Sequence, residues 1–141
     1  MNAEEHMSRA QLLAPELAPH LDGSDAAPLA VPRCVACGTH QWPPRPSCAV
    51  CRSTEFVSTP VDPVGTIYSW TTTHRAPTPE FAHLVPYTIV VVALDEPHRI
   101  RLLGRLAPTN EAPSLRVGLR VQGTRERSAE GVPLLVWNII A

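Results

Sequence analysis

Residues 34–51 read CVACGTHQWPPRPSCAVC, and this stretch contains all four cysteines of the chain, Cys34, Cys37, Cys48 and Cys51. Two Cys-x-x-Cys pairs that each lead into a turn supply the four thiolates with which proteins close a tetrahedral shell around one zinc ion. Such a shell leaves no position for water or substrate, which excludes a Lewis-acid role for the metal. The stretch therefore predicts one structural Zn²⁺ site.

The loop between the two pairs spans residues 38–47 and is shorter than the loop of common zinc ribbons. Gly38 can turn the chain, and prolines 43, 44 and 46 favour an extended return that brings the second pair to the first. A redox pair, structural disulfides, or His40 in place of one cysteine are the alternatives. The chain start lacks the pattern of a signal peptide, so a cytoplasmic location with reduced thiols is expected.

Composition excludes several functional classes. The 141 residues carry a net charge of −1, which disfavours a nucleic acid as the main partner. No run of eighteen apolar residues is present, so no membrane span is expected. All 12 basic residues are arginine, which removes Schiff-base and phosphate-loop lysines. The Gly-x-Ser-x-Gly, His-Glu-x-x-His and Gly-x-Gly-x-x-Gly motifs are also missing. The sequence therefore offers few catalytic groups for an independent enzyme.

Beyond Val57, apolar and β-branched runs alternate with Gly, Pro and Asn turns, without a helical period. The predicted strands are Val64–Arg75, Tyr87–Asp95, Arg99–Leu106, Arg120–Arg127 and Leu134–Ile140. Short turns at residues 96–98 and 128–131 predict two hairpins, and a longer connection near residues 108–118 joins the third strand to the fourth. Five such strands favour a small Greek-key barrel such as the OB-fold, with an open β-sandwich as the alternative.

The first thirty residues are rich in alanine, and leucines 12, 13, 17 and 21 recur at near-helical intervals. Pro15 and Pro19 restrict any helix there to short turns. We therefore expect a short, partly helical N-terminal segment before the metal-binding part.

The predicted strand at residues 87–94 lacks polar alternation, as expected of a strand that is covered on both faces. A five-stranded barrel covers only its inside. The outer face, which carries either Val90 and Val92 or Ile89 and Val91, is therefore expected to contact the metal-binding part, the N-terminal segment or another chain.

Tyr68 and Trp70 stand two apart on one predicted strand and are expected to face the same side. In an OB-fold that binds single-stranded nucleic acid, such a pair forms a base-stacking platform. The other interpretation is a pair of residues in the barrel core. The chain has only three Trp, two Tyr and two Phe, whereas a protein that binds single strands is expected to combine several aromatic rings with a basic groove. A single-stranded nucleic-acid-binding module is therefore kept only as the alternative function.

The order of motifs along the chain resembles a known family. The motifs are the cysteine stretch with PPR at residues 43–45, GTIYS at 65–69, HRAP at 74–77, PY at 86–87, GRL at 104–106 and VGLRV at 117–121. Over residues 31–138 they are similar to the family first catalogued as domain of unknown function thirty-five. Together with the strand pattern, the resemblance implies a mostly β fold. Its parts are a partly helical N-terminal segment at residues 1–30, a rubredoxin-like zinc ribbon at 31–58 and a five-stranded OB-fold barrel at 59–141.

The resemblance also implies an accessory role. Members of the family are typically small subunits, encoded beside a thiolase-fold protein, that dock on its dimer and help shape an acyl-coenzyme A site for making or breaking carbon–carbon bonds. Related domains accompany steroid side-chain retro-aldol enzymes and acyltransferases of phloroglucinol type. The expectation is therefore a non-catalytic subunit in a hetero-oligomer with a thiolase-fold partner, with acyl-CoA at the shared site.

His74 and Arg75 are expected at the interface near the acyl channel of the partner, together with Tyr68 and Trp70. Guanidinium groups suit the phosphates of coenzyme A, and the loop at residues 74–77 follows a strand end, where binding loops leave a rigid scaffold. No catalytic residue is assigned. An independent enzyme is the third functional class, and it would combine His74 with a carboxylate. The candidate carboxylates are Asp62, Asp95 and Glu96.

Overall fold

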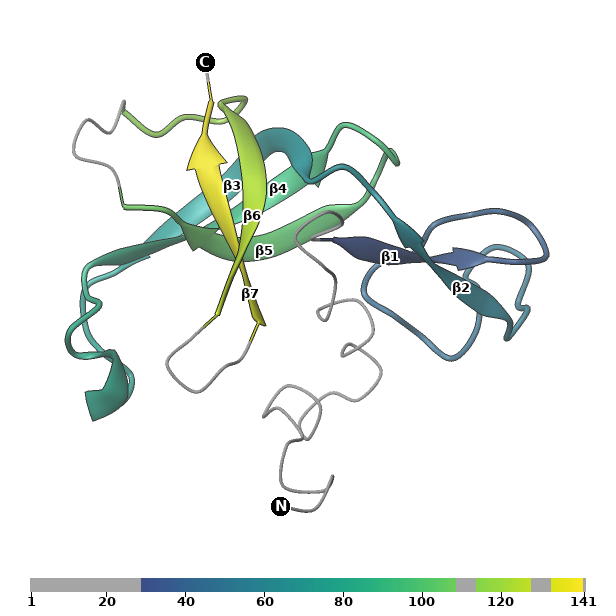
Figure 1. The fold of residues 1–141 in the computed structure, drawn as a ribbon, viewed down its shortest axis with the longest axis horizontal. Coiled ribbons are helices and arrows are strands. Elements are labelled where there is room, and N and C mark those ends of the chain that lie inside the picture. Colours follow the sequence, from purple (N-terminus) through teal and green to yellow (C-terminus); the bar gives the residue numbers. More distant parts are fainter. Residues whose placement is uncertain (1–28, 109–113, 128–132, 141) are drawn as a thin grey trace. The chain divides into compact units, whose positions relative to one another are not determined.

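The regular structure of the described residues consists almost entirely of β-strands. The computed structural model describes residues 29–108, 114–127 and 133–140. Its strands are β1 (Ala30–Cys34), β2 (Phe56–Pro60), β3 (Val64–Thr73), β4 (Tyr87–Leu94), β5 (Arg101–Leu106), β6 (Arg120–Arg127) and β7 (Pro133–Ile139) (Figure 1). One 3₁₀ helix, η2 (Pro79–Phe81), lies in the loop between β3 and β4. The mostly β fold class is confirmed.

Contacts divide the chain into two compact units, the first containing the two-stranded ribbon and the second most of the barrel. The predicted helical segment lies outside the described residues, apart from residues 29 and 30. The predicted turn at residues 128–131 also lies outside them. The domain boundaries at residues 30 and 58 stay predictions. Among the described residues, no helix has the length and apolar character needed to cross a membrane.

β1 and β2 form a two-stranded antiparallel sheet that the sequence pattern did not indicate. The register runs from Ala30 opposite Pro60 to Cys34 opposite Phe56. In a two-stranded sheet both strands are edge strands, so the prolines in them, which lack an N–H group, can be accommodated. Val31 is fully buried, and β1 ends at the buried Cys34, so the strand anchors the first metal-binding cysteine.

The remaining five strands close into a barrel with the order β3-β4-β5-β7-β6. β3 pairs with β4 along most of its length and with β6 through its first three residues, Val64–Thr66. β5 and β7 are parallel, whereas the neighbouring pairs β3–β4, β4–β5 and β3–β6 are antiparallel. The predicted five-stranded barrel is confirmed. The open β-sandwich alternative is wrong, because the pairing of β3 with β6 closes the sheet.

The predicted strand bounds differ from the observed ones by at most two residues. β3 ends at Thr73, so residues 74 and 75, which were predicted to belong to the strand, lie in the following loop. β5 begins at Arg101 because Arg99 has a φ of 71°, a left-handed conformation that a strand does not accommodate. The tight turn at residues 96–98 joins β4 to β5, as predicted.

Buried aliphatic side chains and one tryptophan fill the barrel. Val90, Val92 and Leu94 point inward from β4, and Trp137 of β7 is fully buried. Gly104 of β5 makes room for this indole, because a Cβ at position 104 would lie 2.6 Å from two atoms of the Trp137 ring. The core is therefore packed too closely at this point for any residue larger than glycine.

The inward direction of Val90 and Val92 decides which face of β4 points outward. Ile89 and Val91 alternate with the two inner valines and lie on the outer face, where both are half-buried. The structure thus selects Ile89 and Val91 from the two pairs that the sequence left open.

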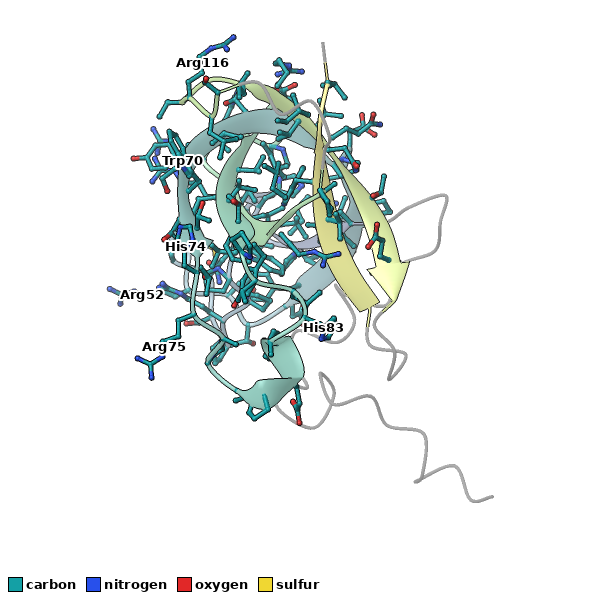
Figure 2. The ribbon with its side chains drawn as sticks, turned by 90° about the vertical axis from the view of Figure 1, so that its left-hand side faces the viewer. Arg52, Trp70, His74, Arg75, His83 and Arg116 are labelled. Carbon is teal, nitrogen blue, oxygen red and sulfur yellow. The ribbon has the colours of Figure 1, made fainter. Side chains whose placement is uncertain are left out.

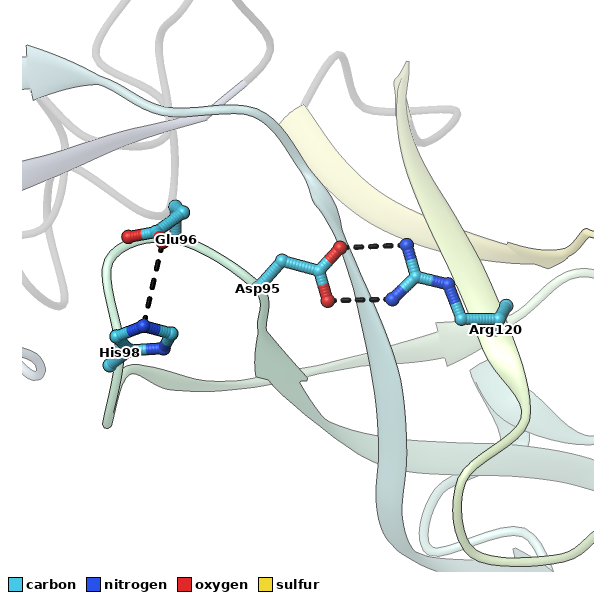
Figure 3. A network of polar contacts seen from close by, with 4 residues as sticks. All are labelled: Asp95, Glu96, His98 and Arg120. Atoms are coloured by element: carbon cyan, nitrogen blue, oxygen red, sulfur yellow. Dashed lines mark hydrogen bonds and ion pairs between the residues drawn. The ribbon is translucent and has the colours of Figure 1, made fainter.

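An ion pair joins the end of β4 to the start of β6 (Figure 3). Arg120 Nη1 and Nη2 donate hydrogen bonds of 2.6 and 2.7 Å to the two carboxylate oxygens of Asp95. The hydrogen bonds from Arg120 lower the pKa of Asp95. Burial opposes this shift, and the charges of Arg120 and His98 act in the same direction as the hydrogen bonds. In the turn that follows, His98 Nε2 lies 3.5 Å from Glu96 Oε1. The bidentate pair spans β3, which lies between β4 and β6 in the barrel.

We predict that Asp95→Asn lowers the melting temperature modestly at pH 7, because both side chains are more than 40% exposed and solvent screens their attraction. The folded-state pKa of Asp95 lies below the ordinary value of 3.8, so its stabilisation is present above that pH and is lost as the pH falls further. The wild-type and Asp95→Asn melting curves should therefore converge as the pH falls below about 3.8.

Thermal unfolding followed by circular dichroism between pH 7 and pH 2.5 measures this convergence. Asp62→Asn, at another exposed aspartate, is the control and should leave the melting temperature at pH 7 unchanged. A constant difference between wild type and Asp95→Asn across the whole pH range would contradict the assignment.

Candidate functional site

The four cysteines of the ribbon lie together. Their Sγ atoms are all within 4.8 Å of one another, with 3.5 Å between Cys34 and Cys51 and 3.6 Å between Cys37 and Cys48. Four sulfurs at the usual zinc–sulfur distance of about 2.3 Å would stand about 3.8 Å apart around the ion. The cluster therefore fits one tetrahedral zinc ion. The separations are much longer than a disulfide bond, and all four cysteines are free thiols.

Two turns with the same hydrogen-bond pattern present the two pairs. In the first, Gly38 N–H donates to Cys34 C=O and Cys34 N–H donates to Thr39 C=O, both at 2.9 Å. In the second, Arg52 N–H donates to Cys48 C=O at 2.9 Å and Cys48 N–H donates to Ser53 C=O at 2.8 Å. The repeat orients both pairs in the same way and so builds a two-fold related ligand set.

In each turn, the fourth residue after the first cysteine adopts a left-handed backbone conformation. Gly38 has a φ of 76° and Arg52 a φ of 67°. Glycine adopts this conformation freely, whereas arginine does so at a cost of about 1 to 2 kcal/mol. The sequence marked the first turn through Gly38, but an arginine gave no such signal for the second.

Gln41 links the two turns from a buried position. Its backbone N–H donates to Pro32 C=O, its side-chain Nε2 donates to Ser47 C=O at 3.1 Å, and its Oε1 accepts a hydrogen bond of 3.0 Å from Ala49 N–H. Gln41 is only 8% exposed, so Ser47 C=O and Ala49 N–H would lose their partner if the side-chain amide were removed. Sequence reasoning missed this residue because a lone glutamine between a histidine and a tryptophan resembles a solvated loop residue.

The thiols of the cluster cannot all ionise without a cation. Hydrogen bonding with Thr39, whose hydroxyl lies 3.2 Å from Cys37 Sγ, lowers the pKa of Cys37 to about 6. At Cys51 a backbone hydrogen bond with Ser53 favours the thiolate, but the Cys34 thiol, burial and the other two thiols together raise the pKa to about 12. A divalent zinc ion removes this conflict, because it binds thiolates and displaces their protons.

The ligand set leaves the metal without a reactive position. Four sulfur ligands close a tetrahedral shell, so zinc in this cluster would support folding rather than bind substrate. His40, the alternative ligand, forms a β-bridge with Arg33 and is not part of the four-sulfur cluster. Burial, followed by the charge of Arg33, lowers the pKa of His40.

A β-bulge in β3 separates Tyr68 from Trp70. Ile67 pairs with Val92 and Ser69 with the adjacent Val91, so β3 has one extra residue at Tyr68. The expectation that Tyr68 and Trp70 face the same side is therefore wrong, because a bulge shifts the alternation of side chains. Tyr68 lies on the face opposite to the buried Ile67, whereas Trp70 pairs with Val90 and shares its face.

Tyr68 has a cationic partner that the sequence did not indicate. The Arg101 guanidinium carbon lies 3.9 Å from the centre of the Tyr68 ring, which is a cation–π contact across β4. The two residues are 33 positions apart in the sequence, and only the pairing of β3, β4 and β5 brings them together. Tyr68 remains 48% exposed and Trp70 39% exposed.

His74 and Arg75 are both exposed in the loop that follows β3. Figure 2 shows Trp70, His74 and Arg75 in succession along β3 and the start of this loop, with Arg116 at the opposite end of the view. All four predicted interface residues thus lie on β3 and the start of the following loop, but the bulge directs Tyr68 and Trp70 to opposite faces of β3. Their role at an interface stays a prediction.

Two protein families match consecutive parts of the chain. The family described as "ChsH2, rubredoxin-like zinc ribbon domain" matches residues 29–57. The family described as "ChsH2, C-terminal OB-fold domain" matches residues 58–124. Together the two matches extend over residues 29–124, in the domain order that the sequence motifs indicated.

Relatives and a solved structure are similar to this chain. A "DUF35 domain-containing scaffold protein" of Methanocaldococcus jannaschii is 38% identical over 69 residues, which are 48% of this chain and 48% of that protein. A "Probable enoyl-CoA hydratase alpha subunit" of Thermomonospora curvata is 35% identical over 72 residues, which are 51% of this chain and 22% of that protein. The chain thus matches less than half the length of these curated relatives. The solved structure "Ltp2-ChsH2(DUF35) aldolase" has a TM-score of 0.71 and 27% identity, over 95% of this chain and 97% of that chain.

We predict that Cys34→Ser or Cys51→Ser abolishes zinc binding and yields insoluble or partner-deficient protein. Structural zinc sites contribute an apparent binding energy of about 10 to 16 kcal/mol at neutral pH, which matches or exceeds the whole stability of a small domain. Zinc content per chain and the soluble fraction after expression measure the effect.

Val50→Ser is the matched control, since Val50 lies between two cysteines of the same turn, is 68% exposed and offers no metal ligand. This variant should keep one zinc ion per chain. A soluble Cys34→Ser protein that still binds one zinc ion would show that the cluster is not the metal site.

Proposed function

The chain belongs to the DUF35 family, with the zinc-ribbon and OB-fold domains of the ChsH2 type, and from this premise we propose that it is an accessory subunit of a thiolase-like enzyme. In this role it docks on the partner and helps to form the acyl-CoA site. The partner carries out the cleavage or formation of a carbon–carbon bond, by retro-aldol, thiolase or acyltransferase chemistry.

The observation that carries the proposal is the similarity to a chain of the solved "Ltp2-ChsH2(DUF35) aldolase". The similarity extends over 95% of this chain and 97% of that one, at 27% identity and a TM-score of 0.71. The relative described as a scaffold protein supports the same role. The relative described as an alpha subunit of an enoyl-CoA hydratase supports a connection with acyl-CoA chemistry.

The chemistry of the chain supports an accessory rather than a catalytic role. With zinc bound, all four thiols are metal ligands, and none remains as a nucleophile. The sequence contains no lysine. His74 and Arg75 are the residues that we place beside the acyl-CoA, because a guanidinium fork suits the pyrophosphate and the 3′-phosphate of the coenzyme. A cytoplasmic location belongs to the same proposal, since a four-thiolate site requires reduced cysteines.

The nucleic-acid alternative loses its main support. A base-stacking platform needs aromatic rings on one surface, and the bulge directs Tyr68 and Trp70 to opposite faces of β3. One face of the Tyr68 ring is also occupied by Arg101.

Co-expression of the chain with a candidate thiolase-fold partner, sought first among the proteins encoded beside its gene, tests the proposed function. We expect a stable hetero-oligomer in size-exclusion chromatography with light scattering, and acyl-CoA turnover that requires both proteins. Failure of the two to associate would refute the accessory role. Salt-sensitive binding of a single-stranded oligonucleotide by the chain alone would instead favour the nucleic-acid alternative.

The reconstituted complex also tests Arg75. We expect Arg75→Ala to raise KM for the acyl-CoA by about tenfold, the loss of one charge-assisted hydrogen bond, with little change in kcat. Arg116→Ala, at an exposed arginine far from Arg75 in Figure 2, is the matched control and should leave KM unchanged. An unchanged KM for Arg75→Ala would remove this residue from the acyl-CoA site.

A further inference from the structure

The outer face of the β3-β4-β5 sheet carries an apolar surface that we call the outer strip. It consists of Tyr68, Ile89, Val91, Arg101, Leu103 and Arg105. The register aligns Val91 with Leu103 and Ile89 with Arg105. These positions alternate with the inward-facing Val90, Val92 and Leu102, which are buried. The outer strip is therefore a continuous surface on three adjacent strands.

The centre of the outer strip is apolar and open to solvent. Leu103 is 67% exposed and Tyr68 48% exposed, while Ile89 and Val91 beside them are half-buried. A leucine exposed to this extent in the middle of a strand adds nothing to the barrel core. Contiguous apolar residues with an aromatic ring among them are typical of protein interaction sites.

The charge on this face is of one sign. The residues of β3 that complete the aligned rows, Thr66, Ser69 and Thr71, are uncharged, and the charged residues in the rows are the arginines at positions 101 and 105. A complementary surface would be apolar at its centre and carry carboxylates at its edge.

The contact between Arg101 and Tyr68 orders both side chains in advance. The guanidinium lies 3.9 Å from the ring centre, so neither side chain needs to give up its full rotamer freedom on binding. Tyrosine and arginine are the residue types that dominate binding energy when they occupy the centre of an interface.

The shape of the surface indicates the kind of occupant. The outside of a closed barrel is convex, whereas small-molecule sites are concave and bury most of their ligand. A coenzyme bound on the outer strip would remain largely in water. A protein surface, by contrast, can cover several strands at once.

We propose that the outer strip is the surface with which the chain docks on its thiolase-like partner, against an apolar patch edged by carboxylates. This inference rests on the proposed function and adds the location of the contact. It assigns Leu103 as the central apolar contact and Arg101 as its cationic neighbour.

The test uses the whole 141-residue chain and the thiolase-fold partner identified by co-expression, and measures their Kd by isothermal titration calorimetry. We expect Leu103→Glu to weaken binding at least tenfold, because it places a charge in the apolar centre and opposite the carboxylates of the partner. Val117→Glu is the matched control. Val117 is 65% exposed, almost as much as Leu103, but it precedes Gly118, which pairs with Ile67 on the edge of β3 away from β4. This variant should bind within threefold of wild type.

A second pair of variants tests the charge without altering the apolar centre. Arg101→Glu should weaken binding and reduce its dependence on salt, whereas Arg116→Glu, at an exposed arginine outside the outer strip, should do neither. Zinc content and melting temperature verify that each variant is folded. If Leu103→Glu does not fold, the comparison of Arg101→Glu with Arg116→Glu tests the docking surface.

The outcomes separate this inference from the proposed function. If the wild-type chain binds its partner and Leu103→Glu and Arg101→Glu bind equally well, the outer strip is not the docking surface, although the accessory role stands. Equal weakening by Leu103→Glu and Val117→Glu would also overturn the inference, because it would reflect net charge alone. If the wild-type chain does not bind the thiolase-fold protein, the proposed function itself fails.

Discussion

The double pairing of β3 is the constraint on which the barrel depends. One edge of this strand pairs with β4 and the other, over its first three residues, with β6, and the second pairing closes the sheet. The strand meets this demand through two local features. Gly65 allows close approach to β4, since a Cβ there would overlap the backbone oxygen of Ala93, and the bulge at Tyr68 shifts the alternation of the strand. The bulge also places Tyr68 on the outside, within reach of Arg101.

The ribbon is organised by a different principle. Among its described residues it has a two-stranded sheet and few buried apolar side chains, which by themselves form a core too small to fold by hydrophobic burial alone. Two turns with the same hydrogen-bond pattern gather four thiols, and Gln41 connects the turns through backbone groups. Zinc binding would supply the missing free energy, because the ligand cluster of such a site is assembled only in the folded state.

The two parts together are consistent with the accessory role that we propose. The ribbon uses its thiols for structure, and the barrel uses its interior for packing, with Trp137 filling the space left by Gly104. Among the described residues, our proposals place function on the outer surface, at the apolar outer strip and at the exposed His74 and Arg75 after β3. An accessory subunit that contributes a docking surface and a few polar groups to the site of a partner fits this distribution better than an enzyme with its own reactive centre.

The sequence by itself determined the metal cluster, the five barrel strands and the family. Each of these depends on local signals: the spacing of Cys34, Cys37, Cys48 and Cys51, the alternation of β-branched runs with turns, and short motifs in a fixed order. The tertiary structure alone decided which residues meet. The bulge at Tyr68 reversed the expected facing of Trp70, because one extra residue in a strand shifts every side chain after it to the other face, and a strand shows this only against its neighbour. The hydrogen bonds of Gln41 and the stacking of Arg101 on Tyr68 gave no signal for the same reason, since contacts across a loop and across a sheet depend on pairing between separate segments.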